Sequence, residues 1–215
     1  MTDKARLTAA FEIVVEHLKK NASTQSAKDN FYGSAERCAK ALLETCKSDQ
    51  EIKDRLDEII KKTFPVEQNE KSPKALGMVT QGPITINSCC PHHLFPVRYS
   101  AYVSYVPKNG RVLGLSKLAR ICKALGERPV LHEQLASDVA DVLHADGETS
   151  TSWPQLESEG SAAMLVGVHT CMACRGVSED ALTSVVELRG CFWDAGFEDK
   201  FVQGVQAIKT SAPFK

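Results

Sequence analysis

Cysteine and histidine side chains are concentrated in two short segments of this 215-residue chain. In the first segment, Cys90-Pro-His-His93, a thiol and an imidazole stand at C-x-x-H spacing. One turn of backbone can aim two such ligands at a single zinc ion. The second segment, HTCMAC at 169–174, offers further ligands of the same kind. Metal binding is therefore the first chemistry that these residues suggest.

The number of ligands decides what such a zinc site can do. Cys90, His93 and Cys171 would leave a fourth position open for water, as in catalytic sites. Adding Cys174 or Cys89 would close the site and make it structural. Two alternatives remain open at this point. The cysteines could be small buried residues beside a histidine that bonds the backbone, or they could form a redox-active dithiol.

His92 and His169 lie beside the candidate ligands but are not needed to complete the coordination shell. An unligated histidine next to a metal is well placed for proton transfer near neutral pH, which is its natural titration range. The same residue can instead hydrogen-bond to a ligand and orient it. The residues alone favour neither role.

A third feature is the stretch GLSKLAR at 114–120. Ser116 is expected to cap the start of a helix, so that the free N–H groups of the first turn face outward. Lys117 and Arg120 add two cations to the same turn, and together with the helix dipole they suit a phosphate group. A capped, solvated helix start without a ligand is the alternative.

The dipeptide His132-Glu133 is expected at the start of the following helix. A fixed carboxylate can accept two parallel N–H bonds, such as those that the N1–H and exocyclic amine of guanine offer. The alternative is a surface glutamate in a favourable position near a helix N-terminus.

The pattern of apolar residues predicts the elements that carry these segments. An N-terminal helical region, 1–70, contains helices at 3–20, 34–47 and 50–62. The second region, 71–215, contains strands and helices, with a polar loop at 147–160. Its strands are expected at 78–88, 96–107, 161–171 and 182–192, and its helices at 116–126, 130–144 and 196–208.

These elements predict an α+β fold in which helices back an antiparallel sheet. A sheet of four strands leaves two edges to cover, and oligomerisation is one way to cover them. The formal net charge of −1 indicates no overall field that would recruit nucleic acid or an anionic membrane. No apolar run approaches 18 residues, so we expect no membrane span. The charged N-terminus does not read as a signal peptide, and we expect eight reduced cysteines in a cytoplasmic setting.

Taken in order, the segments resemble the GTP cyclohydrolase I family. The matching motifs are C-x-H-H after a strand, GLSKLAR into a helix, H-E in the next helix, and H-x-C-M-x-x-R-G at 169–176. The resemblance spans roughly 78–201, with a fainter match in SAERCAK at 34–40. The motifs are jointly specific because their order and separation must all agree.

The resemblance implies hydrolysis of GTP at C8, release of formate and rearrangement to 7,8-dihydroneopterin triphosphate. Cys90, His93 and Cys171 would hold zinc with one position left for water, and the metal would activate that water. His92 and His169 would move protons to and from the imidazole ring of the substrate as it opens.

The other matched residues would hold the substrate. Glu133 would anchor the guanine, and His132 would approach the base or ribose. Hydroxyl and cationic side chains would hold the triphosphate: Ser116, Lys117, Arg120, Arg175, Arg37 and Lys40. In this family the fold is the tunnelling fold, which here would cover 71–215 as the catalytic domain, and it is assembled into a homodecameric ring with sites between subunits.

The chain departs from the family pattern at several places. Pro91 stands where the family usually has Glu, and His132-Glu133-Gln134 replaces Gln-Glu-Arg. Ser34-Ala35 replaces Thr-Pro, and the loop at 147–160 is longer than usual. Two other functions therefore stay open. One is a cyclohydrolase that acts on another purine nucleotide or stops at a ring-opened formamide, and the other is a non-catalytic subunit that binds zinc or nucleotide. The product could serve folate, other pterin or 7-deazaguanine biosynthesis.

Overall fold

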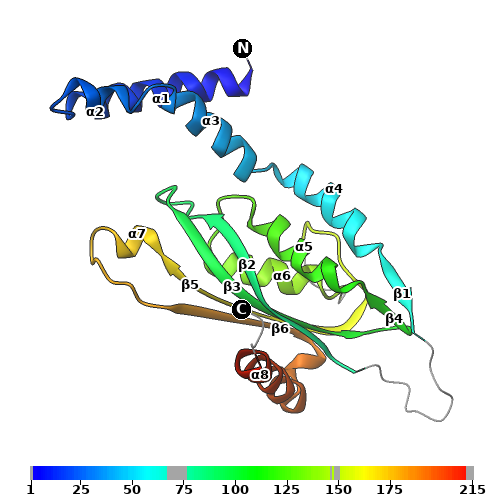
Figure 1. Cartoon of the computed structure of the whole chain (residues 1–215). Coiled ribbons are helices and arrows are strands. Elements are labelled where there is room, and N and C mark those ends of the chain that lie inside the picture. The colour runs from blue at the N-terminus through cyan, green and yellow to red at the C-terminus, as the bar shows by residue number, and fades with distance from the viewer. Residues whose placement is uncertain (1, 67–76, 146, 148–150, 212–215) are drawn as a thin grey trace, which may run out of the picture. The chain divides into compact units, whose positions relative to one another are not determined.

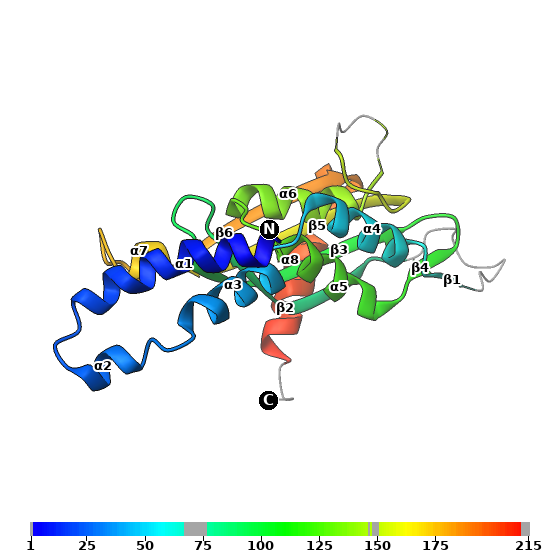
Figure 2. The same ribbon diagram turned by 90° about the horizontal axis from the view of Figure 1, so that it is seen from above.

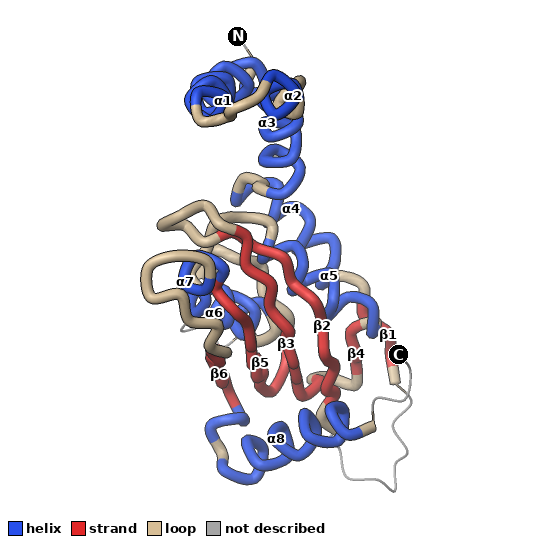
Figure 3. Tube along the Cα trace, turned by 60° about the vertical axis from the view of Figure 1, so that its left-hand side comes forward, coloured by secondary structure: helices blue, strands red, loops and turns tan. Residues whose placement is uncertain are grey.

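Alternating apolar and polar residues build a four-stranded antiparallel sheet with the order β2-β3-β5-β6 (Figure 3). The computed structural model describes residues 2–66, 77–145, 147 and 151–211. The strands are β2 (Val79–Cys89), β3 (Pro96–Pro107), β5 (Ser158–His169) and β6 (Thr183–Gly190). The predicted strands are thus confirmed, and the α+β class with an antiparallel sheet is correct.

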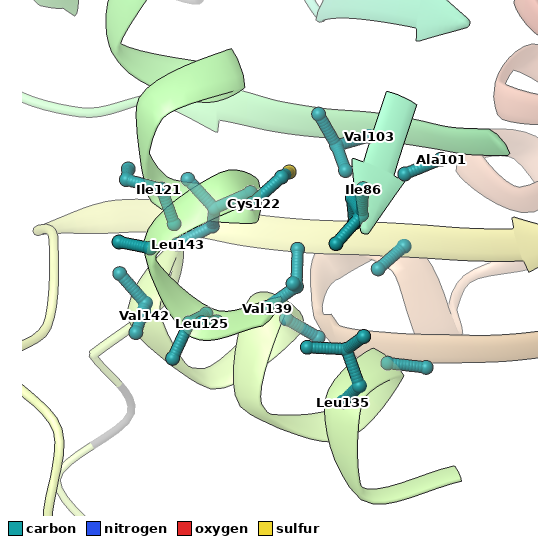
Figure 4. Close-up of a cluster of buried hydrophobic side chains, with 14 of the residues drawn as sticks. Ile86, Ala101, Val103, Ile121, Cys122, Leu125, Leu135, Val139, Val142 and Leu143 are labelled. Carbon is teal, nitrogen blue, oxygen red and sulfur yellow. The ribbon is translucent and has the colours of Figure 1, made fainter. Parts of the chain in front are cut away.

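Two helices cover one face of this sheet, α5 (Leu115–Gly126) and α6 (His132–Val142), as Figures 1 and 2 show. The apolar stripe of α5, which contains Leu118, Ile121 and Leu125, is buried. It meets the apolar face of β3, which includes Ala101 and Val103 (Figure 4). Full burial raises the pKa of the Cys122 thiol to about 12, which makes it an inert core residue.

The opposite face of the sheet is covered by α8 (Ala195–Thr210), which follows the 3₁₀ turn Cys191–Trp193. Tyr102 and Val106 of β3 point to this side and pack with Phe192 and Phe201. The central strand is therefore buried on both faces, which explains why almost every residue from Ala101 to Pro107 is apolar.

A second, two-stranded sheet pairs β1 (Thr63–Pro65) with β4 (Arg111–Leu113), and sequence reasoning missed it. Just before β1, α4 (Asp49–Ile60) starts with a capping box between Ser48 and Glu51. Ile52 and Leu56 of this helix are fully buried in the main core.

The chain divides into two compact units, Met1–Lys47 and Ser48–Lys215. In the first unit α1 (Asp3–Lys20) packs against α3 (Ser34–Thr45). The short α2 (Gln25–Asp29) lies in the segment of chain that connects them. By contrast, α4 belongs to the second unit because its apolar face is part of that unit's core. The expected boundary at residues 70 and 71 lies outside the described residues.

The long loop before β5 is not simply polar. Trp153 and Leu156 are buried, and Ala145 N–H and Leu156 N–H form backbone bonds that join the loop to the end of α6. The Arg128 guanidinium lies over the Trp153 ring at 5.0 Å from its centroid. Among the described helices, none combines the length and apolarity that a membrane crossing requires.

Candidate active site

The first metal-ligand segment forms the hairpin loop between β2 and β3. Cys89 and Pro96 are paired across the two strands, and the loop is closed by Cys90 N–H on Phe95 O at 2.9 Å and Leu94 N–H on Cys90 O at 2.8 Å. Neither bond uses the N–H of residue 91, so Pro91 costs this loop no hydrogen bond. Proline also suits the first corner of a turn because its ring fixes φ.

The second segment reaches the same end of the sheet from the other side of β3. Val97 pairs with His169, the last residue of β5, and the short α7 (Thr170–Ala173) follows directly. Thr170 Oγ1 donates to Pro96 O, which ties the start of α7 to the start of β3. Because β3 pairs with both β2 and β5, the two segments must meet.

Where they meet, Cys90, His93 and Cys171 place their ligand atoms within 4.8 Å of one another. The Cys90 Sγ and His93 Nδ1 atoms are 3.6 Å apart. Tetrahedral zinc with ordinary Zn–S and Zn–N bonds requires a separation of about 3.6 Å between such atoms. Among the described residues this group has three members, and neither Cys89 nor Cys174 belongs to it. The donor set and its geometry therefore fit a metal ion with an open position.

The pKa values of two of these ligand side chains are shifted in opposite directions. Burial and the nearby Arg175 and His92 lower the pKa of His93, which keeps the imidazole in the neutral form that ligates metal. Burial, followed by the proximity of Cys90, raises the pKa of the Cys171 thiol, because two thiolates side by side repel. A cation between the two sulfurs would remove that repulsion.

Behind the metal group lies a stack of three rings, formed by the buried Tyr99 and His132 and the half-buried His169. The ring centroids of Tyr99 and His132 are 4.5 Å apart, and those of His132 and His169 are 5.4 Å apart. Gly167 makes room for this stack, since a Cβ there would lie 2.5 Å from the Tyr99 ring. His132 is only 3% exposed, with Nε2 3.1 Å from Leu165 O and Nδ1 3.5 Å from His169 Nε2.

Sequence reasoning missed Tyr99, which reads as one more core residue of β3. Its side chain is 1% exposed, and its hydroxyl has no hydrogen-bond partner among the described residues. Burial raises the pKa of Tyr99, and the proximity of Cys90, Glu133 and Cys171 raises it further. The phenol thus lies near the metal group and stays protonated. The one available signal was a tyrosine two residues after Val97, on the strand that follows the Cys90 and His93 loop.

The remaining predicted residues at this end of the sheet are exposed. His92 is in the hairpin loop, with its ring 6.2 Å from that of His93. Glu133 occupies the first turn of α6, which confirms that His132-Glu133 begins this helix. Arg175 follows α7 and acts electrostatically on both His93 and Cys171.

The predicted phosphate-binding residues of α5 lie elsewhere. The start of α5 is tied to the far end of β3, since Leu113 N–H donates to the Tyr105 hydroxyl at 2.7 Å. Tyr105 is about 30 Å along the strand from Pro96. Instead, the end of α5 is near the metal group, where Val130 N–H donates to Cys89 O. Figure 1 accordingly shows β4 and α7 at opposite ends of the sheet.

Ser116 is not the helix cap that the sequence indicates. The N-cap is Gly114, which makes no side-chain bond, and α5 begins at Leu115. Ser116 is therefore inside the first turn, exposed beside the half-buried Lys117. Arg120 is exposed one turn further on. The two cations and the hydroxyl do share one helix start, as expected.

Arg37 and Lys40 are both exposed on α3, in the first unit. Arg37 donates to the Ser34 hydroxyl at 3.0 Å, and the Lys40 ammonium is 3.8 Å from Glu44. These contacts are local to α3.

Comparison with known proteins agrees with this geometry. Residues 10–206 match the family model described as GTP cyclohydrolase I. The chain belongs to the GTP cyclohydrolase I family. The match covers nearly the whole chain, including both metal-ligand segments and the start of α5.

Members of the GTP cyclohydrolase I family in other organisms align along most of their length. A protein named GTP cyclohydrolase 1 from Pelotomaculum thermopropionicum is 31% identical over 193 residues, which cover 89% of this chain and 90% of that protein. Another of that name from Carboxydothermus hydrogenoformans is 28% identical over 89% of this chain and 88% of its own. A solved structure titled archaeosine synthase QueF-Like in the apo form aligns with 56% of this chain and 97% of its own, at a TM-score of 0.37 and 17% identity.

Proposed function

We propose that this chain hydrolyses GTP at C8, releases formate and forms 7,8-dihydroneopterin triphosphate with the help of zinc. The observation that carries the proposal is the convergence of Cys90, His93 and Cys171, with His169 next to them, in a member of the GTP cyclohydrolase I family. Bound zinc would supply a Lewis acid that activates water for attack on C8.

The other side chains at this end of the sheet then have distinct tasks. His92 and His169 hold and move protons at the imidazole ring of the substrate, since both rings flank the ligands without belonging to the metal group. Glu133, exposed at the start of α6, accepts the two N–H bonds of the guanine edge. Arg175 brings a positive charge to the same place and suits a phosphate.

The triphosphate carries more negative charge than Arg175 alone can balance. Ser116, Lys117 and Arg120 form a suitable group, but within one subunit they lie at the other end of β3. We infer that a second copy of the chain brings its α5 start to the metal group, so that the enzyme is a homo-oligomer with sites shared between copies. The resemblance suggests a tunnelling fold closed into a decameric ring, in which Arg37 and Lys40 would also reach the substrate.

A non-catalytic zinc protein would need a closed site. Cys174 and Cys89 could have closed it, but among the described residues both are outside the ligand group, and Cys174 is exposed. This geometry supports the catalytic reading over the structural one.

The decisive test is product analysis with GTP labelled at C8. Purified protein with measured zinc content should release the label as formate and leave an unlabelled pterin triphosphate, identified by mass spectrometry. A product that retains the label would indicate that the reaction stops at the formamide. Zinc-loaded protein that leaves GTP unchanged while converting another purine nucleotide would refute GTP as the substrate.

A further inference from the structure

His132 is enclosed by the protein on every side. It is 3% exposed, it stacks on Tyr99, and each of its two ring nitrogens has a partner within the chain. A histidine that contacts a substrate must offer at least one nitrogen to it. The described geometry leaves none free, even though the ring is only one residue from Glu133.

The partners determine where the protons are. The Leu165 carbonyl can only accept, so His132 Nε2, 3.1 Å away, must carry the hydrogen. Burial lowers the pKa of His132 and keeps the ring neutral, so its Nδ1 has a lone pair. His169 Nε2, 3.5 Å from that lone pair, must then be the donor. A separation of 3.5 Å is long for such a bond, as is common in catalytic sites without substrate.

We propose that His132 is a positioning residue, which fixes the ring orientation and the proton position of His169 instead of contacting the substrate. The chain of bonds runs from the β5 backbone at Leu165 through His132 to His169. Its consequence is that His169 keeps its hydrogen on Nε2 and exchanges protons with the substrate through Nδ1. The catalytic readout of this proposal rests on the function proposed above, whereas the position of the protons does not.

The packing around the pair supports a fixed orientation. The Tyr99 ring lies against both histidines, with its centroid 5.8 Å from that of His169. Leu165 and Gly167, which border the stack, belong to β5, the strand that ends in His169 itself. A tilt of the His132 ring would therefore break its bond to Leu165 O of β5, the strand whose last residue is His169.

Nitrogen NMR of the zinc-loaded protein, labelled with ¹⁵N-histidine, tests the proton positions directly. At mildly alkaline pH we expect the ring hydrogen on Nε2 in both His132 and His169. Replacing His132 by leucine should remove the preference of His169 for that tautomer. A His132 protonated on Nδ1, or an unchanged His169 signal in His132→Leu, would overturn the proposal.

Substitutions separate positioning from substrate contact. In His132→Gln the amide can still donate to Leu165 O and accept from His169, so kcat should stay within about threefold of the parent. His132→Leu should lower kcat about 10- to 100-fold with KM nearly unchanged, as expected for a lost orienting bond. A raised KM with an unchanged kcat would instead indicate substrate contact and refute the proposal.

His144→Leu is the matched control, because His144 is also buried, at 7% exposed, and its Nδ1 lies 3.1 Å from Ser158 in another part of the fold. It should leave the His169 nitrogen signals unchanged. If His144→Leu altered them as much as His132→Leu does, the effect would be general loosening and the proposal would fail. If GTP were not hydrolysed even by the parent, the proposed function would fail, while the NMR result would still decide the role of His132.

Discussion

The two ends of the four-stranded sheet differ in how much of a functional site a single chain assembles there. At one end, two segments about 80 residues apart in sequence meet across β3, and their ligand atoms already have the spacing that zinc requires. At the other end, the first turns of α5 carry the exposed Ser116 and Arg120 and the half-buried Lys117, and the three-member ligand group of the described residues does not include them. Strand pairing inside one chain assembles the metal end. The cations at the start of α5, by contrast, can bind substrate only when a phosphate group, or the metal end of a second copy, is brought next to them.

Removing a metal ligand should have the largest effect. Cys90→Ala and Cys171→Ala should lose zinc and lower kcat by about a thousandfold or more, since the Lewis acid contributes several kcal/mol. Zinc content by elemental analysis and formate release check both parts. Cys174→Ala and Cys89→Ala are the matched controls and should keep their zinc. Loss of zinc in Cys174→Ala would mean a closed, structural site.

Changing the cationic end should weaken substrate binding without touching the metal. Lys117→Ala and Arg120→Ala should raise KM for GTP about 10- to 100-fold, because each removes a charge-assisted bond to phosphate. Zinc content should be unchanged. Lys123→Ala, an exposed cation on the same helix, is the control and should behave like the parent.

Mixing subunits sharpens the comparison further. If each site combines the metal end of one copy with the α5 start of another, then Cys90→Ala and Lys117→Ala subunits, unfolded and reassembled together, should regain part of the activity that each lacks alone. If the mixed oligomers assemble but recover no activity, the metal group and the α5 start of one site would have to come from the same subunit. That result would contradict the shared site.

A smaller effect concerns the buried histidine behind the metal end. The folded-state pKa of His132 is lowered from 6.5, so between these two values the unfolded chain binds more protons than the folded one. The free energy of unfolding should therefore rise with pH up to about 6.5 and fall on acidification, by at most about 1.4 kcal/mol per pH unit for one proton. The groups around the ring are His169, Tyr99 and Glu133. Urea unfolding at several pH values should show a shallower slope for His132→Gln, and an equal slope would contradict the buried neutral state.

The smallest effect concerns the Tyr99 hydroxyl. Tyr99→Phe keeps the ring against His132 and removes a buried hydroxyl that has no partner among the described residues. Leaving such a group unpaired is costly, so the substitution should stabilise the metal-free protein by up to about 1 kcal/mol. Urea denaturation measures this change. Destabilisation instead would show that the hydroxyl is hydrogen-bonded in solution.

Local spacing predicted that the Cys90 and His93 side chains lie close together, because ligands of one ion must do so. Cys90 and His93 must stand about one turn apart to share an ion, and that requirement is visible in the sequence. Strand alternation likewise predicted β2, β3, β5 and β6, since a sheet with buried faces needs apolar residues at fixed intervals.

What could not be predicted depends on packing between distant segments. Tyr99 looks like any strand residue until Gly167 of the neighbouring strand makes room for its ring. Ser116 has the chemistry of an N-cap, but α5 begins at Leu115, directly after the pairing of β1 with β4, and its N-cap is Gly114. The three-residue strands themselves are too short to show a period. Trp153 lies in a polar stretch, and its ring is covered by Arg128, which is 25 positions earlier in the chain.

The central claim is that a zinc ion held by Cys90, His93 and Cys171 is required for attack on C8 of GTP. The most direct measurement removes zinc from the purified protein with a chelator, adds it back in steps, and follows formate release against bound metal. The account predicts that activity rises in proportion to bound zinc up to one ion per chain, and that Cys171→Ala does not recover. Full formate release from metal-free protein, or zinc restored to one ion per chain with no formate from GTP, would contradict it.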